Sequence, residues 1–513
     1  MKKEFSRQTR QQWLNELEDE DYDLIIIGGG ITGAGILLDA TSRGIKTLLV
    51  EMQDFAAGTS SRSTKLVHGG IRYLKQKDFK LVAEVGKERA IVRNNARHIV
   101  HPIPVMVPIY KGGSMKKWEL QLGMLLFEWL VRIQEKFLSK GYNKEETLKR
   151  EPELNPEKLV GSVKYFENRT DDARLTLENI KTAIELGAKA INYTKVEEFL
   201  FDENEVICGL KVSDQLTGET KKVKAKQIIN AAGPWVDDVR ERDDVSVKHQ
   251  LVLTKGVHLV FKKDRFPVNN AVYFDTHDKR MAFAVPADDI TYLGTTDTFY
   301  KGDISNPDIT EEDITYLLKI ANLKFPKLHL THEDIISSWS GLRPLINEEG
   351  KKPSEISRKD EVFISKSGLI SIAGGKLTGY RKMAEKATNI VADRLHITTP
   401  CSTATINLVG GQAKSEDHFH QLESEALRDA LKLGITKPDA LWLLSKYGTE
   451  TFSVLNGDVE NAVLPKYLAL ALAYSKKYEM VITEDDFITR RSSFSFFEPE
   501  KKEKFANGVK QSL

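Results

Sequence analysis

Three glycines near the start of the chain have the spacing that binds a dinucleotide. Residues 28–35 read GGGITGAG, so Gly28, Gly30 and Gly33 satisfy the G-x-G-x-x-G pattern. In that pattern the first glycine permits a tight turn, the second lets a pyrophosphate approach the backbone, and the third lets a helix pack against a strand. Glu51 follows about 20 residues farther on, where an acid accepts hydrogen bonds from adenosine ribose hydroxyls. The chemistry indicated is the binding of NAD or FAD.

The elements predicted around these glycines are those that such a site needs. Residues 22–27 (YDLIII) are an apolar, β-branched run typical of a strand buried in a parallel sheet, and residues 45–50 form a second such run that ends at Glu51. Between them, residues 36–43 are predicted to form a helix that Gly44 ends. Strand, turn, helix, strand and acid therefore follow in order, which favours a Rossmann-like domain over a glycine turn with a structural role alone.

A segment rich in glycine and hydroxyl groups follows the second strand. Residues 58–74 read GTSSRSTKLVHGGIRYL and include Ser60 and Ser61. Such a segment can wrap a second, larger ring system along the same crevice, which favours FAD over NAD. The same composition is common in ordinary polar loops, and that interpretation stays open at this point.

The composition predicts a folded cytoplasmic protein. For 513 residues we expect about three domains. The net charge of +1 disfavours a nucleic-acid partner, and with it a tRNA-modifying flavoprotein. Two cysteines, Cys208 and Cys401, are too few for a four-thiolate zinc site or an iron–sulfur cluster and fit a reducing compartment. The first twenty residues contain no signal-peptide core, and the apolar stretch at residues 24–38 is too short to span a bilayer.

A series of motifs in chain order resembles the FAD-dependent glycerol-3-phosphate dehydrogenases, which are flavoproteins of the D-amino-acid-oxidase type. The motifs are GGGITGAG from residue 28, SSRSTKLVHGGIRYL from 60, NAAGPW from 230, KGVHLV from 255, GTTD from 294, GLRPL from 341 and AGGKLTGYRKMAE from 373. The resemblance implies that noncovalently bound FAD oxidises sn-glycerol 3-phosphate to dihydroxyacetone phosphate and that the electrons pass to a membrane quinone.

The resemblance also implies roles for individual residues. His258 is expected to take the proton of the C2 hydroxyl, because imidazole titrates near neutral pH, although a lone histidine on such a strand is usually structural. The substrate phosphate is expected to meet arginines, which bind it bidentately and stay charged. The catalytic set is His258, Arg343 and Lys376, and the substrate-binding set is Arg72, Tyr73 and Thr295. The cofactor-binding set is Gly28, Gly30, Gly33, Glu51, Ser60, Ser61, Val196, Gly233, Gly375 and Thr378, and no metal is expected.

The expected fold class is α/β, with a Rossmann-like FAD-binding domain interleaved with an antiparallel-sheet substrate domain and followed by an all-α domain. The FAD-binding domain is expected at residues 20–110, 170–245 and 345–395. The substrate or cap domain is expected at residues 111–169 and 246–344, and the helical domain at 396–513.

An amphipathic segment suggests where the protein meets lipid. Residues 118–137 (WELQLGMLLFEWLVRIQEKF) place large apolar side chains at helical spacing, as a peripheral quinone reductase requires on the inner face of the cytoplasmic membrane. Packing of this helix on the core, or in a homodimer interface, is the other interpretation.

Other activities stay open. The nearest is a glycerol-3-phosphate oxidase that uses O2 and makes H2O2, and an amino-acid or amine oxidase on the same fold is more distant. A flavin-binding regulatory protein is disfavoured because Arg343, Lys376 and His258 are all present in their motifs.

Overall fold

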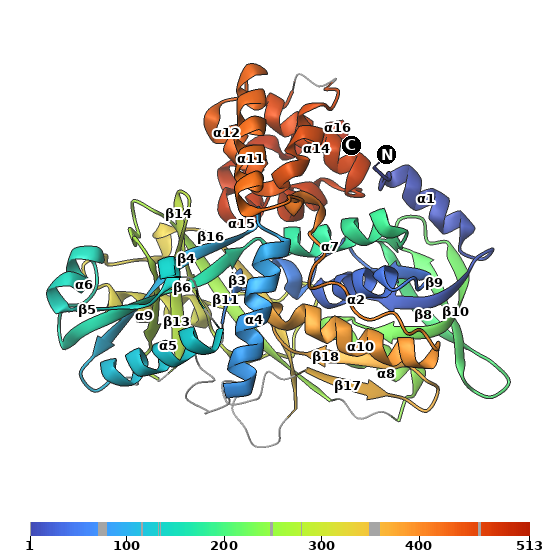
Figure 1. Ribbon diagram of the computed structural model, residues 1–513, viewed down its shortest axis with the longest axis horizontal. Helices are drawn as coiled ribbons and strands as arrows, with labels where there is room; N and C mark the ends of the chain where they lie inside the picture. Colours follow the sequence, from blue (N-terminus) through green and yellow to red (C-terminus); the bar gives the residue numbers. More distant parts are fainter. Residues whose placement is uncertain are drawn as a thin grey trace.

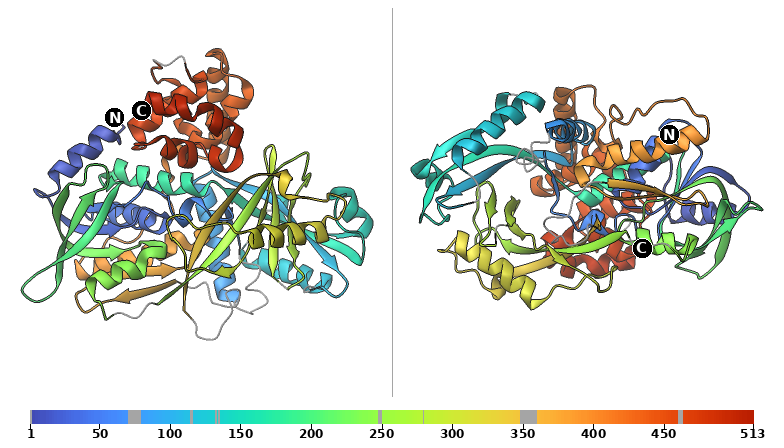
Figure 2. Two further views of the ribbon diagram at one scale, coloured as in Figure 1. Left: turned by 180° about the vertical axis from the view of Figure 1, so that it is seen from behind. Right: turned by 90° about the horizontal axis from the view of Figure 1, so that it is seen from below.

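The computed structural model has two mixed sheets side by side and a helical domain on top of them (Figure 1). It describes residues 2–69, 79–113, 116–131, 133, 135–246, 250–278, 280–347, 360–459 and 463–513. A second pair of views shows the same three parts from behind and from below (Figure 2). The predicted α/β architecture with an antiparallel second sheet and an all-α C-terminal domain is confirmed.

The first sheet is built on a parallel core of buried apolar strands. β10, β1, β2 and β7 run parallel, and Ile25 and Ile26 of β1 lie in register with Ile228 and Ile229 of β10. β17 closes one edge antiparallel to β18. Among the described residues the order is β17 (Asp360–Ile364), β18 (Ile370–Gly374), β10 (Thr220–Asn230), β1 (Asp21–Ile27), β2 (Thr47–Val50) and β7 (Lys189–Ile191), and β8 (Thr194–Phe201) and β9 (Ile207–Asp214) join through β10.

Helices cover this sheet closely. Gly35 of α2 (Ile31–Ser42) faces Tyr380 and Ala384 of α10 (Tyr380–Arg394), and an added Cβ would come within 3.1 Å of both side chains. The small residue therefore lets the two helices touch. The other helices of this part are α1 (Arg7–Glu16), α4 (Phe79–Asn95), α7 (Asp172–Leu186) and α8 (Val236–Asp243).

The second sheet is mainly antiparallel. Its described strands, in order, are β15 (Thr298–Phe299), β11 (Leu251–Lys262), β14 (Ile290–Gly294), β13 (Met281–Ala287), β12 (Ala271–Asp275), β4 (Val100–Tyr110), β6 (Leu159–Thr170) and β3 (Leu66–Val67), and β16 (Ile335–Ile346) pairs with β11 and β5 (Lys140–Asn143) with β6. Helices α5 (Lys117–Val131), α6 (Lys144–Arg150) and α9 (Glu311–Lys324) flank it. β4 lies in this sheet because it pairs with β6 along its whole length, although the expected cap segment starts only at residue 111.

The C-terminal domain is helical and docks on α7. Its elements are α11 (Glu416–Lys432), α12 (Lys437–Tyr447), α13 (Thr451–Leu455), α14 (Lys466–Tyr478), the π-helical turn η8 (Asp486–Arg491), α15 (Phe494–Phe497) and α16 (Pro499–Ser512). Buried ion pairs join it to the rest of the molecule, together with packing of Phe496 and Phe497 on Trp339 and Tyr292.

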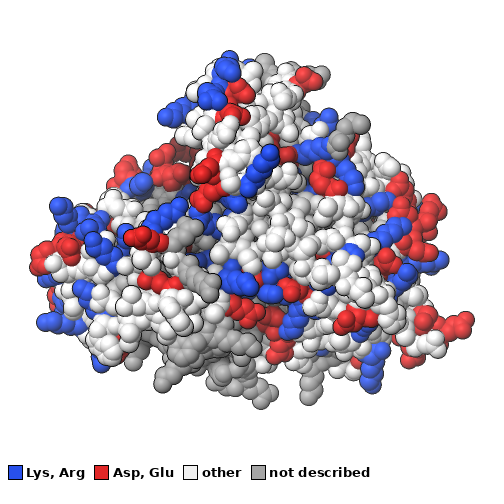
Figure 3. All heavy atoms as spheres, in the orientation of Figure 1, with Lys and Arg blue, Asp and Glu red and all other residues white. Residues whose placement is uncertain are grey.

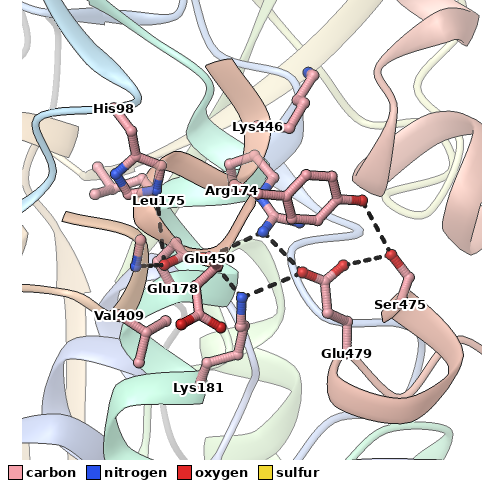
Figure 4. Close-up of polar contacts among 12 residues, drawn as sticks. His98, Arg174, Leu175, Glu178, Lys181, Val409, Lys446, Glu450, Ser475 and Glu479 are labelled. Atoms are coloured by element: carbon pink, nitrogen blue, oxygen red, sulfur yellow. Dashed lines mark hydrogen bonds and ion pairs between the residues drawn. The ribbon is translucent and has the colours of Figure 1, made fainter. Parts of the chain in front are cut away.

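One such joint lies between α7 and the C-terminal end of α14 (Figure 4). Arg174 Nη2 donates to Glu178 Oε1 at 2.9 Å and to Glu479 Oε1 at 2.7 Å, and Lys181 Nζ donates to the same two oxygens. Ser475 Oγ donates to the other oxygen of Glu479 at 2.7 Å. Burial alone would raise the pKa of Glu178, but Lys181 and Arg174 lower it to about 2, so Glu178 is ionised at neutral pH.

Candidate active site

The glycine turn after β1 has the close contacts that its motif requires. Gly28 has a φ of +110°. A Cβ on Gly33 would lie 1.9 Å from the carbonyl oxygen of Gly28, and a Cβ on Gly28 would lie 2.7 Å from that of Ala231. Side chains at these two positions would push the turn open. The turn therefore presents bare backbone at the N-terminus of α2, where the helix dipole and free N–H groups favour a phosphate.

Glu51 lies at the end of β2 and is hydrogen-bonded to this turn. Its Oε2 accepts from the backbone N–H of Gly29 at 2.6 Å, and its Oε1 accepts from that of Gln53 at 2.8 Å. Burial raises the pKa of Glu51, and these two N–H groups oppose the rise. Each carboxylate oxygen keeps a further lone pair for a ribose hydroxyl.

Ser60 and Ser61 lie in the short helical turn η1 (Thr59–Ser61) against the start of α2. Ser60 Oγ accepts from the N–H of Ile31 at 2.9 Å. Gly30 at the N-cap has no side chain, so Ser60 supplies the capping oxygen from another part of the chain. The carbonyl of Ser61 accepts from Lys65 Nζ at 2.8 Å.

The other predicted cofactor residues lie on neighbouring strand ends of the first sheet. Gly233 begins the turn after β10, has a φ of +56°, and an added Cβ there would meet no described atom within 4 Å. The N–H of Ala231 in this turn donates to the carbonyl of Ile27 at 2.8 Å, so the turn abuts the glycine motif. Val196 on β8 is buried, and its carbonyl accepts from Arg242 Nη1 at 2.9 Å.

Gly375 and Thr378 lie where β18 leads into α10. Gly374 and Gly375 have φ values of +82° and +79°, so the chain reverses there in a conformation that favours glycine. Thr378 Oγ1 donates to the carbonyl of His68 at 3.1 Å. This contact joins the late glycine turn to the HGG segment, and Lys376 stands between the two glycines and the helix.

His258 lies in the middle of β11, packed between side chains from three other segments. It is only 1% exposed, and its ring stacks on Trp339 of β16 with centroids 4.7 Å apart. Its Nε2 is 3.0 Å from Thr64 Oγ1, and its Nδ1 has no hydrogen-bond partner among the described residues. A Cβ on Gly294 would lie 2.2 Å from the ring, so glycine there leaves room for it.

The surroundings of His258 keep it neutral. Burial, followed by the charges of Arg343 and Lys65, lowers the pKa of His258 well below its ordinary value. A neutral imidazole has a free lone pair and can accept a proton at pH 7. Trp339 covers one face of the ring and Nδ1 is enclosed, whereas Nε2 faces the Thr64 hydroxyl.

Arg343 and Thr295 form the second pair that the sequence predicted. Arg343 Nη2 donates to Thr295 Oγ1 at 3.0 Å, and Nη1 donates to Asp297 Oδ1 at 3.3 Å. A Cβ on Gly256 of β11 would lie 2.4 Å from Arg343 Nη2 and 2.5 Å from Thr295 Oγ1, so this glycine makes the space for the pair. Arg343 is partly exposed, and a guanidinium is a planar, permanently charged group of the kind that binds anions.

The structure brings some predicted residues together and leaves two untested. His258 and Arg343 lie on the adjacent strands β11 and β16, and the charge of Arg343 acts on His258. Arg72 and Tyr73 fall outside the described residues.

Three residues that complete this arrangement were missed from the sequence. Thr64 binds the His258 ring, Trp339 stacks on it, and Lys65 is buried in an ion pair with Asp172 at 2.6 Å. Trp339 stands two positions before the first residue of the GLRPL motif, which was the only available signal. Thr64 and Lys65 stand inside the SSRSTK stretch with nothing to distinguish them from its other hydroxyl and basic residues.

Comparisons with known proteins agree with this geometry. The family described as FAD dependent oxidoreductase matches residues 23–381, and that described as C-terminal domain of alpha-glycerophosphate oxidase matches residues 401–513. The chain is 48% identical over 498 residues to the aerobic glycerol-3-phosphate dehydrogenase of Staphylococcus aureus, covering 95% of this chain and 89% of that protein.

Solved structures show the same likeness. The glycerol-3-phosphate dehydrogenase of Bacillus halodurans, solved with FAD, aligns with a TM-score of 0.85 at 45% identity and covers 98% of this chain and 92% of that one. The L-alpha-glycerophosphate oxidase of Mycoplasma pneumoniae, also with FAD bound, aligns with a TM-score of 0.57 at 19% identity and covers 72% of this chain and 95% of that one. The second likeness is one of fold alone.

Proposed function

Since the chain belongs to the FAD-dependent glycerol-3-phosphate dehydrogenases, within the FAD dependent oxidoreductase family, we propose that it oxidises sn-glycerol 3-phosphate to dihydroxyacetone phosphate and passes the electrons to a membrane quinone. The observation that carries this proposal is the pairing of a buried, neutral imidazole at His258 with a partly exposed guanidinium at Arg343 on the adjacent strand. Oxidation of a secondary alcohol that also carries a phosphate needs a base for the hydroxyl proton and a cation for the phosphate.

The residues on the first sheet fit FAD. The bare glycine turn at Gly28 and Gly33 suits the pyrophosphate, Glu51 the adenosine ribose, and the open turn at Gly233 a neighbouring part of the cofactor. When bound, FAD supplies the acceptor for the hydride that leaves C2 of the substrate. The backbone N–H groups at the start of η5 (Leu377–Gly379) and α10, after Gly375, would stabilise the negative charge that a bound flavin gains on reduction. Cys208 and Cys401 lie outside these motifs, so the proposed binding is noncovalent.

His258 removes the proton of the C2 hydroxyl on its Nε2. For the C2 hydroxyl to reach the lone pair of Nε2, the Thr64 hydroxyl turns away from donating to that nitrogen; after the transfer it accepts from Nε2–H, because a threonine hydroxyl can do either. Stacking on Trp339 keeps the ring in place throughout. The nearby Arg343 and Lys65 make the protonated ring unfavourable, so it gives its proton up again once the product leaves.

Arg343 binds the substrate phosphate, with Thr295 as a hydroxyl donor beside it. The contacts with Asp297 and Thr295 hold the guanidinium of Arg343 in one orientation, and its charge and partial exposure suit a phosphate dianion. On the basis of the family resemblance, we assign Lys376, Arg72 and Tyr73 to the part of the site that binds the phosphate and the reacting atoms of the substrate.

The surface of α5 supports a membrane acceptor. Trp118 and Trp129 are 62% and 75% exposed, and Leu122 and Leu125 lie on the same helix with most of their surface open. Figure 3 shows largely uncharged surface over this helix with basic side chains beside it. Exposed tryptophan and leucine with flanking lysine suit an anionic bilayer surface. Among the described residues, no helix is long and apolar enough to cross a membrane. The proposed place is the inner face of the cytoplasmic membrane.

The acceptor is tested by reoxidation. The purified protein is reduced anaerobically with sn-glycerol 3-phosphate. Reduction is followed as the loss of absorbance at about 450 nm, the band of oxidised flavin. A quinone analogue or oxygen is then admitted. Fast reoxidation by quinone and slow reoxidation by oxygen is the expected result. The opposite order would make the protein a glycerol-3-phosphate oxidase, and reduction by D-amino acids alone would refute the substrate.

Membrane contact is tested separately. Trp129→Glu is expected to weaken binding to anionic liposomes while FAD content stays normal. Unchanged liposome binding in the folded, FAD-loaded variant would leave α5 as a packing or subunit surface.

A further inference from the structure

Two neighbouring arginines of the C-terminal domain bind a carboxylate of the FAD-binding domain. Arg490 Nε donates to Asp54 Oδ2 at 2.5 Å, and Arg491 donates to both oxygens, with Nη2 at 3.0 Å from Oδ1. Asp54 and Arg491 are each 1% exposed. Burial alone would raise the pKa of Asp54, but Arg491 and Arg490 hold it below its ordinary value. We call these three residues the Asp54 clamp.

Asp54 lies on the loop after β2, and both ends of that loop are bound to the glycine turn. At the first end, Glu51 Oε2 accepts from the N–H of Gly29 at 2.6 Å. At the other end, the N–H of Ala56 donates to the carbonyl of Gly29 at 3.0 Å. Gly29 therefore has both backbone groups bonded to residues that flank Asp54, and a shift of Asp54 would disturb both bonds.

The loop between these ends also orients Glu51. The N–H of Gln53, next to Asp54, donates to Glu51 Oε1 at 2.8 Å. The carbonyl of Gln53 accepts from the N–H of Tyr193 at 2.8 Å, which ties the loop to the segment before β8. Asn192 in that segment donates to Asp54 Oδ1 at 3.1 Å and to the carbonyl of Met480 at 3.1 Å. The adenosine end of the site is thus connected to the C-terminal domain by side chains on both sides.

The clamp arginines are themselves held within the C-terminal domain. Arg491 Nη2 donates to the carbonyl of Glu479 at 2.7 Å, and Arg490 contacts Asp485 and Asp486 of the same turn. An arginine with its donors in a fixed orientation can bind one carboxylate in one place only. The π-helical turn η8 therefore sets the position of Asp54 rather than following it.

We propose that the Asp54 clamp positions Glu51 and the glycine turn, so that docking of the C-terminal domain determines how tightly the adenosine half of FAD is held. Asp54, Arg490 and Arg491 are positioning residues, because they act through Gln53, Glu51 and Gly29. The inference rests on the proposed role of Glu51 as the acceptor for the adenosine ribose.

The test compares ligands that occupy different halves of the cofactor site. FAD is removed from the full-length protein, and the apoprotein is titrated with FAD, with ADP and with FMN. Arg490→Met and Arg491→Lys are expected to weaken FAD and ADP about tenfold and to leave FMN unchanged. Arg491→Lys keeps the charge but loses the fork that spans Asp54 and Glu479, so it tests the geometry if Arg490→Met folds poorly.

Lys446→Gln is the matched control. Lys446 Nζ binds Asp171 Oδ2 at 2.6 Å and so also joins the C-terminal domain to the FAD-binding part, but away from the loop at residues 51–56. This variant is expected to lower the melting temperature without changing the ratio of ADP to FMN affinity. An equal weakening of ADP and FMN in the clamp variants, or the same change in Lys446→Gln, would show general loosening and overturn the proposal.

Glu51→Gln separates the proposal from its premise. If Glu51→Gln weakens ADP and the clamp variants do not, the clamp has no role in cofactor binding and Glu51 keeps its assignment. If Glu51→Gln leaves ADP binding unchanged, the assignment of Glu51 falls and the proposal falls with it. Weakening of ADP by both kinds of variant, with FMN unchanged, supports the proposal.

Discussion

The two ends of the proposed cofactor site are built by different means. At the end around Gly28, Gly33 and Glu51, backbone groups lie within contact distance and an ion pair from another domain holds the adjoining loop. At the end around His258, side chains from distant segments pack on one another, and their positions follow from ring stacking and single hydrogen bonds. We expect changes in the glycine turn to prevent cofactor binding and changes in the Asp54 clamp to weaken it. Changes around His258 should lower the rate while FAD stays bound.

Replacement of Gly33 by valine is expected to have the largest effect. Its Cβ would lie 1.9 Å from the Gly28 carbonyl oxygen, which the turn has no room to avoid. The purified variant should contain almost no flavin, as measured by the ratio of visible to protein absorbance. Gly218→Ala is the control: at a φ of +79° it strains the backbone, but its Cβ meets nothing within 4 Å, and the variant should keep its flavin. Normal flavin content in Gly33→Val would contradict the contrast between the two ends.

His258→Ala should give the opposite pattern, with normal flavin content and little turnover. A general base contributes about 10²–10⁴-fold to the rate, and kcat should fall within that range. Substrate binding should change little, because Arg343 remains. Steady-state kinetics of the FAD-loaded variant decide this, and a kcat near that of the unaltered protein would remove His258 as the base.

Arg343→Lys is expected to raise KM more than it lowers kcat. Lysine keeps the charge but cannot bind the phosphate with two parallel hydrogen bonds. Losing one hydrogen bond to a charged group costs about 1.5–3 kcal/mol, so kcat/KM should fall roughly tenfold to a hundredfold. Arg265→Lys, in the turn after β11 and paired with Asp334, serves as control and should leave kcat/KM unchanged. A fall in kcat with constant KM would place Arg343 at the reacting atoms instead of the phosphate.

Thr64→Val removes the hydrogen bond to His258 Nε2 and keeps the shape of the side chain. A hydrogen bond of this kind is worth about 0.5–1.5 kcal/mol, so kcat should fall up to about tenfold. Thr64→Ser should restore most of the rate, since it retains the hydroxyl. A loss in Thr64→Ser with no loss in Thr64→Val would mean that the methyl group, and not the hydroxyl, holds the ring.

The pH profile gives the smallest and most specific effect. His258 has a lowered pKa, so it stays neutral, and active as a base, as the pH falls from 8 through 6.5, and it becomes protonated only at lower pH. The plot of kcat/KM should therefore stay level over that interval as far as His258 determines it. A falling limb centred near 6.5 that disappears in His258→Ala would show that burial does not shift this group.

The sequence predicted the first end of the site better than the second. Gly28, Gly33 and Glu51 are close in the chain, and strand, turn and helix follow one another, so local rules suffice. His258 meets Thr64 and Trp339 only because β11, β16 and the segment after η1 come together in the fold. The Asp54 clamp joins residues more than 400 positions apart and has no local signal.

The central claim is tested most directly by anaerobic rapid mixing of the FAD-loaded protein with sn-glycerol 3-phosphate. The account predicts complete flavin reduction by this substrate, no reduction by glycerol, and a rate of reduction in His258→Ala lower by about 10²-fold or more. Failure of the FAD-loaded protein to be reduced, or equal reduction by glycerol, would contradict it.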